Sequence, residues 1–182
     1  HEEGMVNLSV GTPVDEVAPI IRKGLTEGAA APGYPQTVGT PELRAAIVAA
    51  MARRYGVTGL ESAVNGGNVL PVIGTKEAIG WLPFLLGVGA GHTVVIPELA
   101  YPTYEVGVRI AGAELLRADS LTQIGPASPT LMFINSPGNP NGKVLGVEHL
   151  RKVVEWARAR EVIVASDECY LGLGWTEQPV SI

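Results

Sequence analysis

The sequence has one cysteine and only three histidines, and this shortage excludes two kinds of site. Cys169 has no second cysteine with which to form a disulfide inside the chain. One thiol and three scattered histidines do not make a metal-binding cluster, so we expect no metal site. This cysteine usage favours a reducing, cytoplasmic setting.

Positive charge is also scarce. The chain has 13 Lys and Arg against 18 Asp and Glu, which gives a net charge of −5. This balance provides no basic surface for a nucleic-acid backbone. We therefore expect no nucleic-acid partner.

Long apolar runs and two common catalytic motifs are missing as well. The longest apolar stretch, 79–90, is interrupted by a proline and two glycines, whereas a membrane-spanning helix needs about 20 apolar residues. The first residues are polar and acidic, unlike a signal peptide. We expect no membrane partner. The serine motif of α/β hydrolases and the P-loop motif do not occur, so those functions lose their main support.

The sequence is instead rich in hydrophobic residues, glycine and proline. Hydrophobic residues make up 46% of the 182 residues, with 23 Gly and 14 Pro, a composition typical of a globular protein. The length fits one ordinary domain. The pattern changes near residue 35, so we predict an N-terminal arm or small-domain segment over 1–35 and a larger domain over 36–182.

Short runs rich in valine and isoleucine alternate with helical patterns from residue 40 onward. The runs lack the alternation of half-exposed strands, which indicates a mainly parallel sheet with helices on both faces. The predicted fold class is therefore α/β. The predicted strands are 69–73, 93–97, 114–117, 131–135 and 162–165, and the predicted helices are 41–55, 76–86, 104–111 and 147–160. Before residue 35 there is one short amphipathic stretch, 17–25.

Polar residues cluster after the predicted strands, at the sheet edge where open parallel sheets bind ligands. Gly74 and Thr75 open a helix, whose free N–H groups and positive end suit a phosphate. A plain helix cap is the alternative. The loop 135–142, with two prolines and three asparagines, is either a β-turn connector or a rigid support for the Asn139 amide.

An acid and several aromatic residues add to this cluster. Asp167 ends an apolar strand, where it is either a surface or capping acid or the partner of a protonated cofactor ring. Tyr101 and Tyr104 are either core or interface aromatics or a face that stacks on a flat ring. Tyr34 lies in an exposed turn. Cys169 follows two acids, which disfavours the thiolate and a nucleophilic role.

Six segments in order carry a resemblance to a known family. They are GTP (11–13), YPQTVGTPELR (34–44), GTKEA (74–78), PELAYPTY (97–104), NSPGNPNG (135–142) and DECY (167–170). Together they resemble the class I/II aminotransferases, which are fold type I pyridoxal-phosphate enzymes. The resemblance implies an incomplete large domain of the aspartate-aminotransferase-like fold. Asn141 is a mild departure, because the family loop usually has Thr before Gly142.

The resemblance also implies roles at the phosphate end of the cofactor, pyridoxal 5′-phosphate. Gly74, Thr75 and Lys76 match the positions that bind its phosphate. Tyr34 matches the tyrosine that reaches the phosphate of the neighbouring subunit, which implies a homodimer with shared sites.

Further roles concern the cofactor ring and the substrate. Tyr101 matches the residue that stacks on the ring, and Asp167 matches the acid that pairs with its protonated nitrogen. Asn139 and Tyr170 match the donors to the 3′ oxygen. Gly11 and Asn139 match positions near the substrate α-carboxylate, so the implied partner is a small amino acid or keto acid.

The family's Schiff-base lysine has no counterpart in this sequence. In the family it follows the Asp-x-x-Tyr strand in a Ser-rich segment, and none of Lys23, Lys76, Lys143 and Lys152 has that setting. We therefore expect the lysine beyond Ile182, in a longer protein of which this chain is an inactive N-terminal segment.

Segments 8–15, 69–76 and 170–175 are similar to those of the actinobacterial N-succinyldiaminopimelate aminotransferases within the family. This implies amino transfer between glutamate and N-succinyl-2-amino-6-ketopimelate, in lysine and diaminopimelate biosynthesis. The alternatives are another fold type I enzyme, such as a different aminotransferase or a carbon–sulfur lyase, and a non-catalytic fragment that binds a ligand or partner.

Overall fold

The computed structural model describes residues 4–6, 11–60, 68–126 and 128–182, in two compact units, His1–Thr37 and Val38–Ile182. Among the described residues of the first unit there is one helix, α1 (Pro19–Gly28), at the amphipathic stretch 17–25. Pro19 occupies its first turn, where the missing N–H costs nothing. That the two units act as an arm and a cofactor-binding domain stays a prediction.

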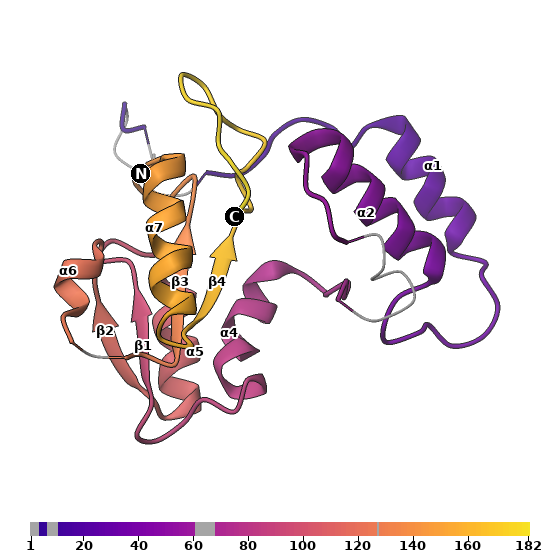
Figure 1. Ribbon diagram of the computed structural model, residues 1–182. Helices are drawn as coiled ribbons and strands as arrows, with labels where there is room; N and C mark the ends of the chain where they lie inside the picture. Colours follow the sequence, from indigo (N-terminus) through magenta and orange to yellow (C-terminus); the bar gives the residue numbers. More distant parts are fainter. Residues whose placement is uncertain (1–3, 7–10, 61–67, 127) are drawn as a thin grey trace. The chain divides into compact units, whose positions relative to one another are not determined.

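Four parallel strands form the sheet of the second unit (Figure 1). They are β1 (Thr93–Ile96), β2 (Glu114–Arg117), β3 (Leu131–Asn135) and β4 (Ile163–Asp167), in the order β2-β1-β3-β4. The register pairs Asn135 with Asp167 at the carboxyl ends of β3 and β4. Two polar residues from distant parts of the sequence are thereby brought side by side.

Helices cover both faces of this sheet, as predicted. Val94 and Ile96 pack in a core with Tyr104 and Val108, whereas Val95, the residue between them in β1, packs in a second core with Val153. Side chains of successive strand residues point to opposite faces, so both faces are buried. The helices of this unit are α2 (Pro41–Tyr55), α4 (Thr75–Leu85), α5 (Pro102–Ala111), α6 (Leu121–Ile124) and α7 (Val147–Arg158).

The sequence prediction was wrong for one strand and missed one helix. Residues 69–73 form no strand, and Pro71 within them has no N–H to donate. Ile73 is 95% exposed, so its hydrophobic character does not mark a core position. The missed helix, α6, has four residues, too few for a periodic pattern, and its signal is a capping box at Ser120 and Gln123. Within the described ranges, no helix is long and apolar enough to cross a membrane.

Close packing of α4 against α5 leads to a testable expectation about stability. A Cβ added at Gly107 would lie 2.7 Å from the Gly80 carbonyl oxygen, which is a backbone atom that cannot swing away. Gly107→Ala should therefore lower the free energy of unfolding of the full-length protein by about 1–3 kcal/mol. The matched control is Gly80→Ala, whose Cβ would meet only Thr103 Cγ2 at 3.6 Å. Equal denaturation midpoints for the two variants would contradict the packing argument.

Candidate active site

One cavity brings together six of the residues singled out in the sequence. It lies at the carboxyl ends of β3 and β4 and the start of α4, the edge at which parallel sheets bind ligands. The six are Thr75, Lys76, Tyr101, Asn139, Asp167 and Tyr170, and Ile79, Asn135 and Cys169 complete the lining.

The start of α4 forms the cationic end of this cavity. Gly74 precedes the helix with a φ of +88°, a conformation that glycine adopts without strain, and it provides no capping side chain. The first N–H groups of the helix therefore lack a side-chain cap and carry the positive end of its dipole. Among the described residues that line the cavity, Lys76 is the one cation. This end is suited to an anion.

Asp167 is the one acidic residue in the part of the cavity lining that the structure describes. The Tyr104 hydroxyl donates to Oδ2 of Asp167 at 2.7 Å, and the Cys169 backbone N–H donates to Oδ1 at 3.2 Å. Both carboxylate oxygens are therefore held, which fixes the plane of the carboxylate. Each oxygen can accept a further hydrogen bond from a cationic ligand.

Asn135 connects this acid to the loop that follows β3. Its side-chain Nδ2 donates to the backbone oxygen of Asp167 at 2.9 Å, and its Oδ1 accepts from the backbone N–H of Asn139 at 2.7 Å. The Asn139 amide in turn donates to the Tyr170 hydroxyl at 3.4 Å. The two groups predicted to face the 3′ oxygen of the cofactor are thereby neighbours.

Two tyrosines at the start of α5 provide the aromatic part of the site. Tyr101 precedes the helix and packs edge-on against Tyr104, with ring centroids 6.2 Å apart. Tyr104 is fully buried and stacks on Phe133 at 4.9 Å. Of the two interpretations left open for these residues, Tyr104 is a core aromatic, whereas Tyr101 lines the cavity.

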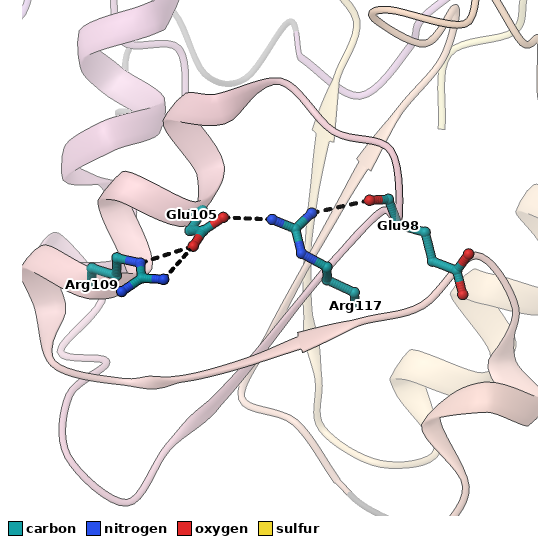
Figure 2. A network of polar contacts seen from close by, with 4 residues as sticks. All are labelled: Glu98, Glu105, Arg109 and Arg117. Carbon is teal, nitrogen blue, oxygen red and sulfur yellow. Dashed lines mark hydrogen bonds and ion pairs between the residues drawn. The ribbon is translucent and has the colours of Figure 1, made fainter.

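An ion-pair network holds α5 against the sheet (Figure 2). Glu105 lies between two arginines: Oε1 accepts from Arg109 and Oε2 from Arg117 of β2, each at 2.5 Å. Arg117 also donates to the backbone oxygen of Glu98 at 3.0 Å. The hydrogen bond from Arg109, together with Arg117, lowers the pKa of Glu105 from its usual value. The network fixes the helical turn that carries Tyr104.

Residues 3–182 match the family model described as aminotransferase class I and II. The chain belongs to the class I and II aminotransferases. Members of this family depend on pyridoxal phosphate, so the cavity can be compared with the shape and charge of that cofactor.

Several proteins of known name or structure are similar to this family member. A "probable aminotransferase" of Mycobacterium tuberculosis (strain ATCC 25618 / H37Rv) is 65% identical over all 182 residues, which span 43% of that protein. The 4-dedimethylamino-4-oxo-anhydrotetracycline transaminase OxyQ of Streptomyces rimosus is 47% identical, and the chain spans 49% of it. The structure of N-succinyldiaminopimelate aminotransferase from Mycobacterium tuberculosis matches 94% of the chain and 47% of its own length, with 28% identity and a TM-score of 0.80. The chain thus spans about half the length of these relatives.

The lining of the cavity fits the aminotransferase cofactor. Pyridoxal phosphate has an anionic phosphate, a flat ring and a ring nitrogen that carries a proton in its cationic form. The cationic start of α4, the ring of Tyr101 and the carboxylate of Asp167 are the complementary groups, and all three line one cavity. Asn139 and Tyr170 add polar groups that can contact the ring oxygen.

Some sequence-predicted residues of the chain lie outside the cavity lining. Gly74 precedes the helix that carries Thr75, consistent with a contribution from its backbone. Tyr34 is fully exposed and Gly11 is exposed, and both belong to the first unit, so their roles stay predictions.

One residue of the site, Asn135, was missed as a functional candidate, and so was one contact, the hydrogen bond from Tyr104 to Asp167. Asn135 was treated only as part of a turn, although an Asn that ends a strand opposite an acid is a usable signal once the register is known. The partner of Tyr104 was also missed, because Asp167 lies 63 residues away in the sequence.

The thiol of Cys169 is expected to react slowly with alkylating reagents. Its sulfur lies 3.4 Å from the Thr75 hydroxyl oxygen. Desolvation of the sulfur and a hydrogen bond with Asp167 raise the pKa of Cys169, as its acidic neighbours led us to expect. The thiol therefore stays protonated at neutral pH, and the thiolate is the reactive form.

The measurement is the rate of iodoacetamide modification at Cys169, followed by peptide mass spectrometry of the full-length protein between pH 7 and 9.5. We expect a rate at pH 7 below that of the same peptide after denaturation and a steep rise toward pH 9.5. A native rate equal to that of the denatured peptide at pH 7 would show that the thiol is not protected.

Proposed function

We propose that the full-length protein is a pyridoxal-phosphate-dependent aminotransferase that moves an amino group between glutamate and a keto acid. The observation that carries this proposal is the placement of Lys76, Tyr101 and Asp167 around one cavity. A cation, an aromatic ring and an acid are the groups that a phosphorylated, protonated pyridine requires.

The polar and aromatic residues of the cavity lining would each act on one part of the cofactor. Lys76 and the first N–H groups of α4 would bind the phosphate, and Tyr101 would orient the ring. Asp167 would keep the proton on the ring nitrogen, because a carboxylate beside it favours the charged form. The bound cofactor supplies a cationic ring that withdraws electrons from the substrate. Asn139 and Tyr170 would orient the ring through its 3′ oxygen.

For the keto substrate we propose N-succinyl-2-amino-6-ketopimelate. The supporting observation is the match to the N-succinyldiaminopimelate aminotransferase of Mycobacterium tuberculosis over 94% of the chain. A second candidate has its own support: the 47% identical OxyQ is a transaminase of a 4-oxo-anhydrotetracycline, so a bulky cyclic ketone is the competing substrate class.

We also propose a homodimer in which Tyr34 of one subunit reaches the phosphate site of the other, and in which Gly11 lies near the substrate carboxylate. The observation in its favour is the full exposure of Tyr34, whose side chain is available to a neighbour. Light scattering of the full-length protein, with Tyr34→Phe tested for weaker cofactor binding, addresses this part. A monomer with full activity would contradict it.

The test of the proposed function uses purified full-length protein with added pyridoxal phosphate. Glutamate consumption is followed with the succinylated keto acid, with a cyclic 4-oxo compound of the tetracycline type, and with simple keto acids such as pyruvate and oxaloacetate. Preferential turnover of the succinylated acid supports the narrow proposal, and preference for the cyclic ketone replaces it. No visible cofactor absorbance and no glutamate consumption with any acceptor would refute the aminotransferase proposal itself.

A further inference from the structure

Tyr104 contacts two different cofactor-facing residues of the proposed site without lining the cavity that they share. Its hydroxyl donates to Oδ2 of Asp167 at 2.7 Å, and its ring meets the edge of Tyr101 at 6.2 Å. One side chain thus fixes both the acid proposed to meet the ring nitrogen and the aromatic group proposed to orient the ring.

The position of Tyr104 is fixed by its surroundings. It is completely buried, and its ring stacks on Phe133 of β3 at an interplanar angle of 22°. The next residue, Glu105, is held by Arg109 and Arg117. The hydroxyl therefore has little freedom to leave Asp167.

The polarity of this hydrogen bond is fixed as well. Burial and the hydrogen bond to Asp167 raise the pKa of Tyr104 far above its ordinary value, so the phenol keeps its proton at neutral pH. Tyr104 therefore donates, and Oδ2 of Asp167 accepts. Among the described residues, the other donor to this carboxylate is the backbone N–H of Cys169 at the longer distance of 3.2 Å.

We infer that Tyr104 is a positioning residue of the aminotransferase site, which acts through Asp167 by holding the orientation of the carboxylate toward the cofactor ring. The inference rests on the proposed function. Hydrogen bonds to charged groups are the strong ones in proteins, so the loss of this one should be measurable in cofactor binding and turnover.

The experiment compares Tyr104→Phe with the matched control Tyr55→Phe in the full-length protein. Tyr104→Phe removes one buried oxygen and keeps the ring that stacks on Phe133. Tyr55 is a partly buried tyrosine of α2 that does not line the cavity, and its ring contacts the Arg54 guanidinium. Both variants lose a hydroxyl, but only one loses the bond to Asp167.

We expect Tyr104→Phe to weaken pyridoxal phosphate binding about tenfold and to lower kcat about tenfold, with the KM for glutamate changed less than about threefold. The pH midpoint of the visible absorbance of the bound cofactor should also move by about half a unit or more, because a carboxylate that has lost a hydrogen-bond donor interacts differently with the proton on the ring nitrogen. Tyr55→Phe should match the wild type in all four quantities.

The outcomes separate the inference from the function on which it rests. An unaltered absorbance midpoint and cofactor affinity in a Tyr104→Phe protein that turns over normally would overturn the inference and leave the proposed function intact. A lower melting temperature of the cofactor-free protein, with unchanged affinity and midpoint once folded, would show a purely structural role and also overturn it. A wild type without bound cofactor or turnover would instead refute the proposed function.

Discussion

Asn in place of Asp167 should lower kcat/KM of the full-length protein by about 10²- to 10³-fold, which corresponds to about 3–4 kcal/mol of lost transition-state stabilisation. Asp167 is the one acid among the residues that line the cavity, so no neighbour there can replace its charge. The neutral amide would no longer favour a proton on the ring nitrogen. Its NH2 group would also meet either the Tyr104 hydroxyl or the Cys169 N–H, both of which donate to the native carboxylate.

The matched control is Glu168→Gln, the same change one residue later. Glu168 faces a different environment, because its carboxylate accepts from the hydroxyls of Ser166 at 2.9 Å and Ser181 at 2.7 Å. Steady-state kinetics of both variants are measured, with cofactor occupancy followed by absorbance. The kcat/KM should fall in Asp167→Asn and change less than about threefold in Glu168→Gln. An Asp167→Asn protein with full occupancy and more than a third of the wild-type kcat/KM would show that the acid is not the proton-holding group.

The layered architecture was predictable because apolar residues fill both faces of the strands. Val94, Val95 and Ile96 are all apolar, and the structure buries the middle one on the opposite side from its neighbours. The same kind of apolar run gave a wrong strand prediction at 69–73, where valine and isoleucine form no strand. Composition reports a preference for extended backbone, but a strand exists only where a neighbouring strand accepts and donates its hydrogen bonds.

The candidate site was predictable to the extent that it follows strand ends. Tyr101, Asn139 and Asp167 each come soon after a strand or at its last residue, so the rule for parallel sheets gathers them at one edge. The contacts that orient them follow from register instead. Asn135 reaches Asp167 because β3 and β4 pair these two residues, and the sequence does not reveal which residues of two strands become partners.

Lys76→Glu, which reverses the charge, should raise the dissociation constant of pyridoxal phosphate by about 10²-fold. Lys76→Gln, which only removes the charge, should raise it roughly tenfold. Lys76 lies in the first turn of α4, beside N–H groups that have no side-chain cap, and no other cation among the described residues lines the cavity. The Gln variant removes the attraction to the phosphate, and the Glu variant adds repulsion from a dianionic group. The helix N-terminus is present in both, so the difference between them reports the charge alone.

The control is Lys152→Glu, the same reversal on the exposed side of α7. Dissociation constants are measured by fluorescence or absorbance titration. The value for Lys152→Glu should equal that of the wild type, the value for Lys76→Gln should be higher, and the value for Lys76→Glu should be the highest. Because Lys76 is exposed, added salt should reduce the gap between the two Lys76 variants. Equal affinities for Lys76→Glu and Lys152→Glu would mean that the phosphate does not bind at the start of α4, and the orientation proposed for the cofactor would then be wrong.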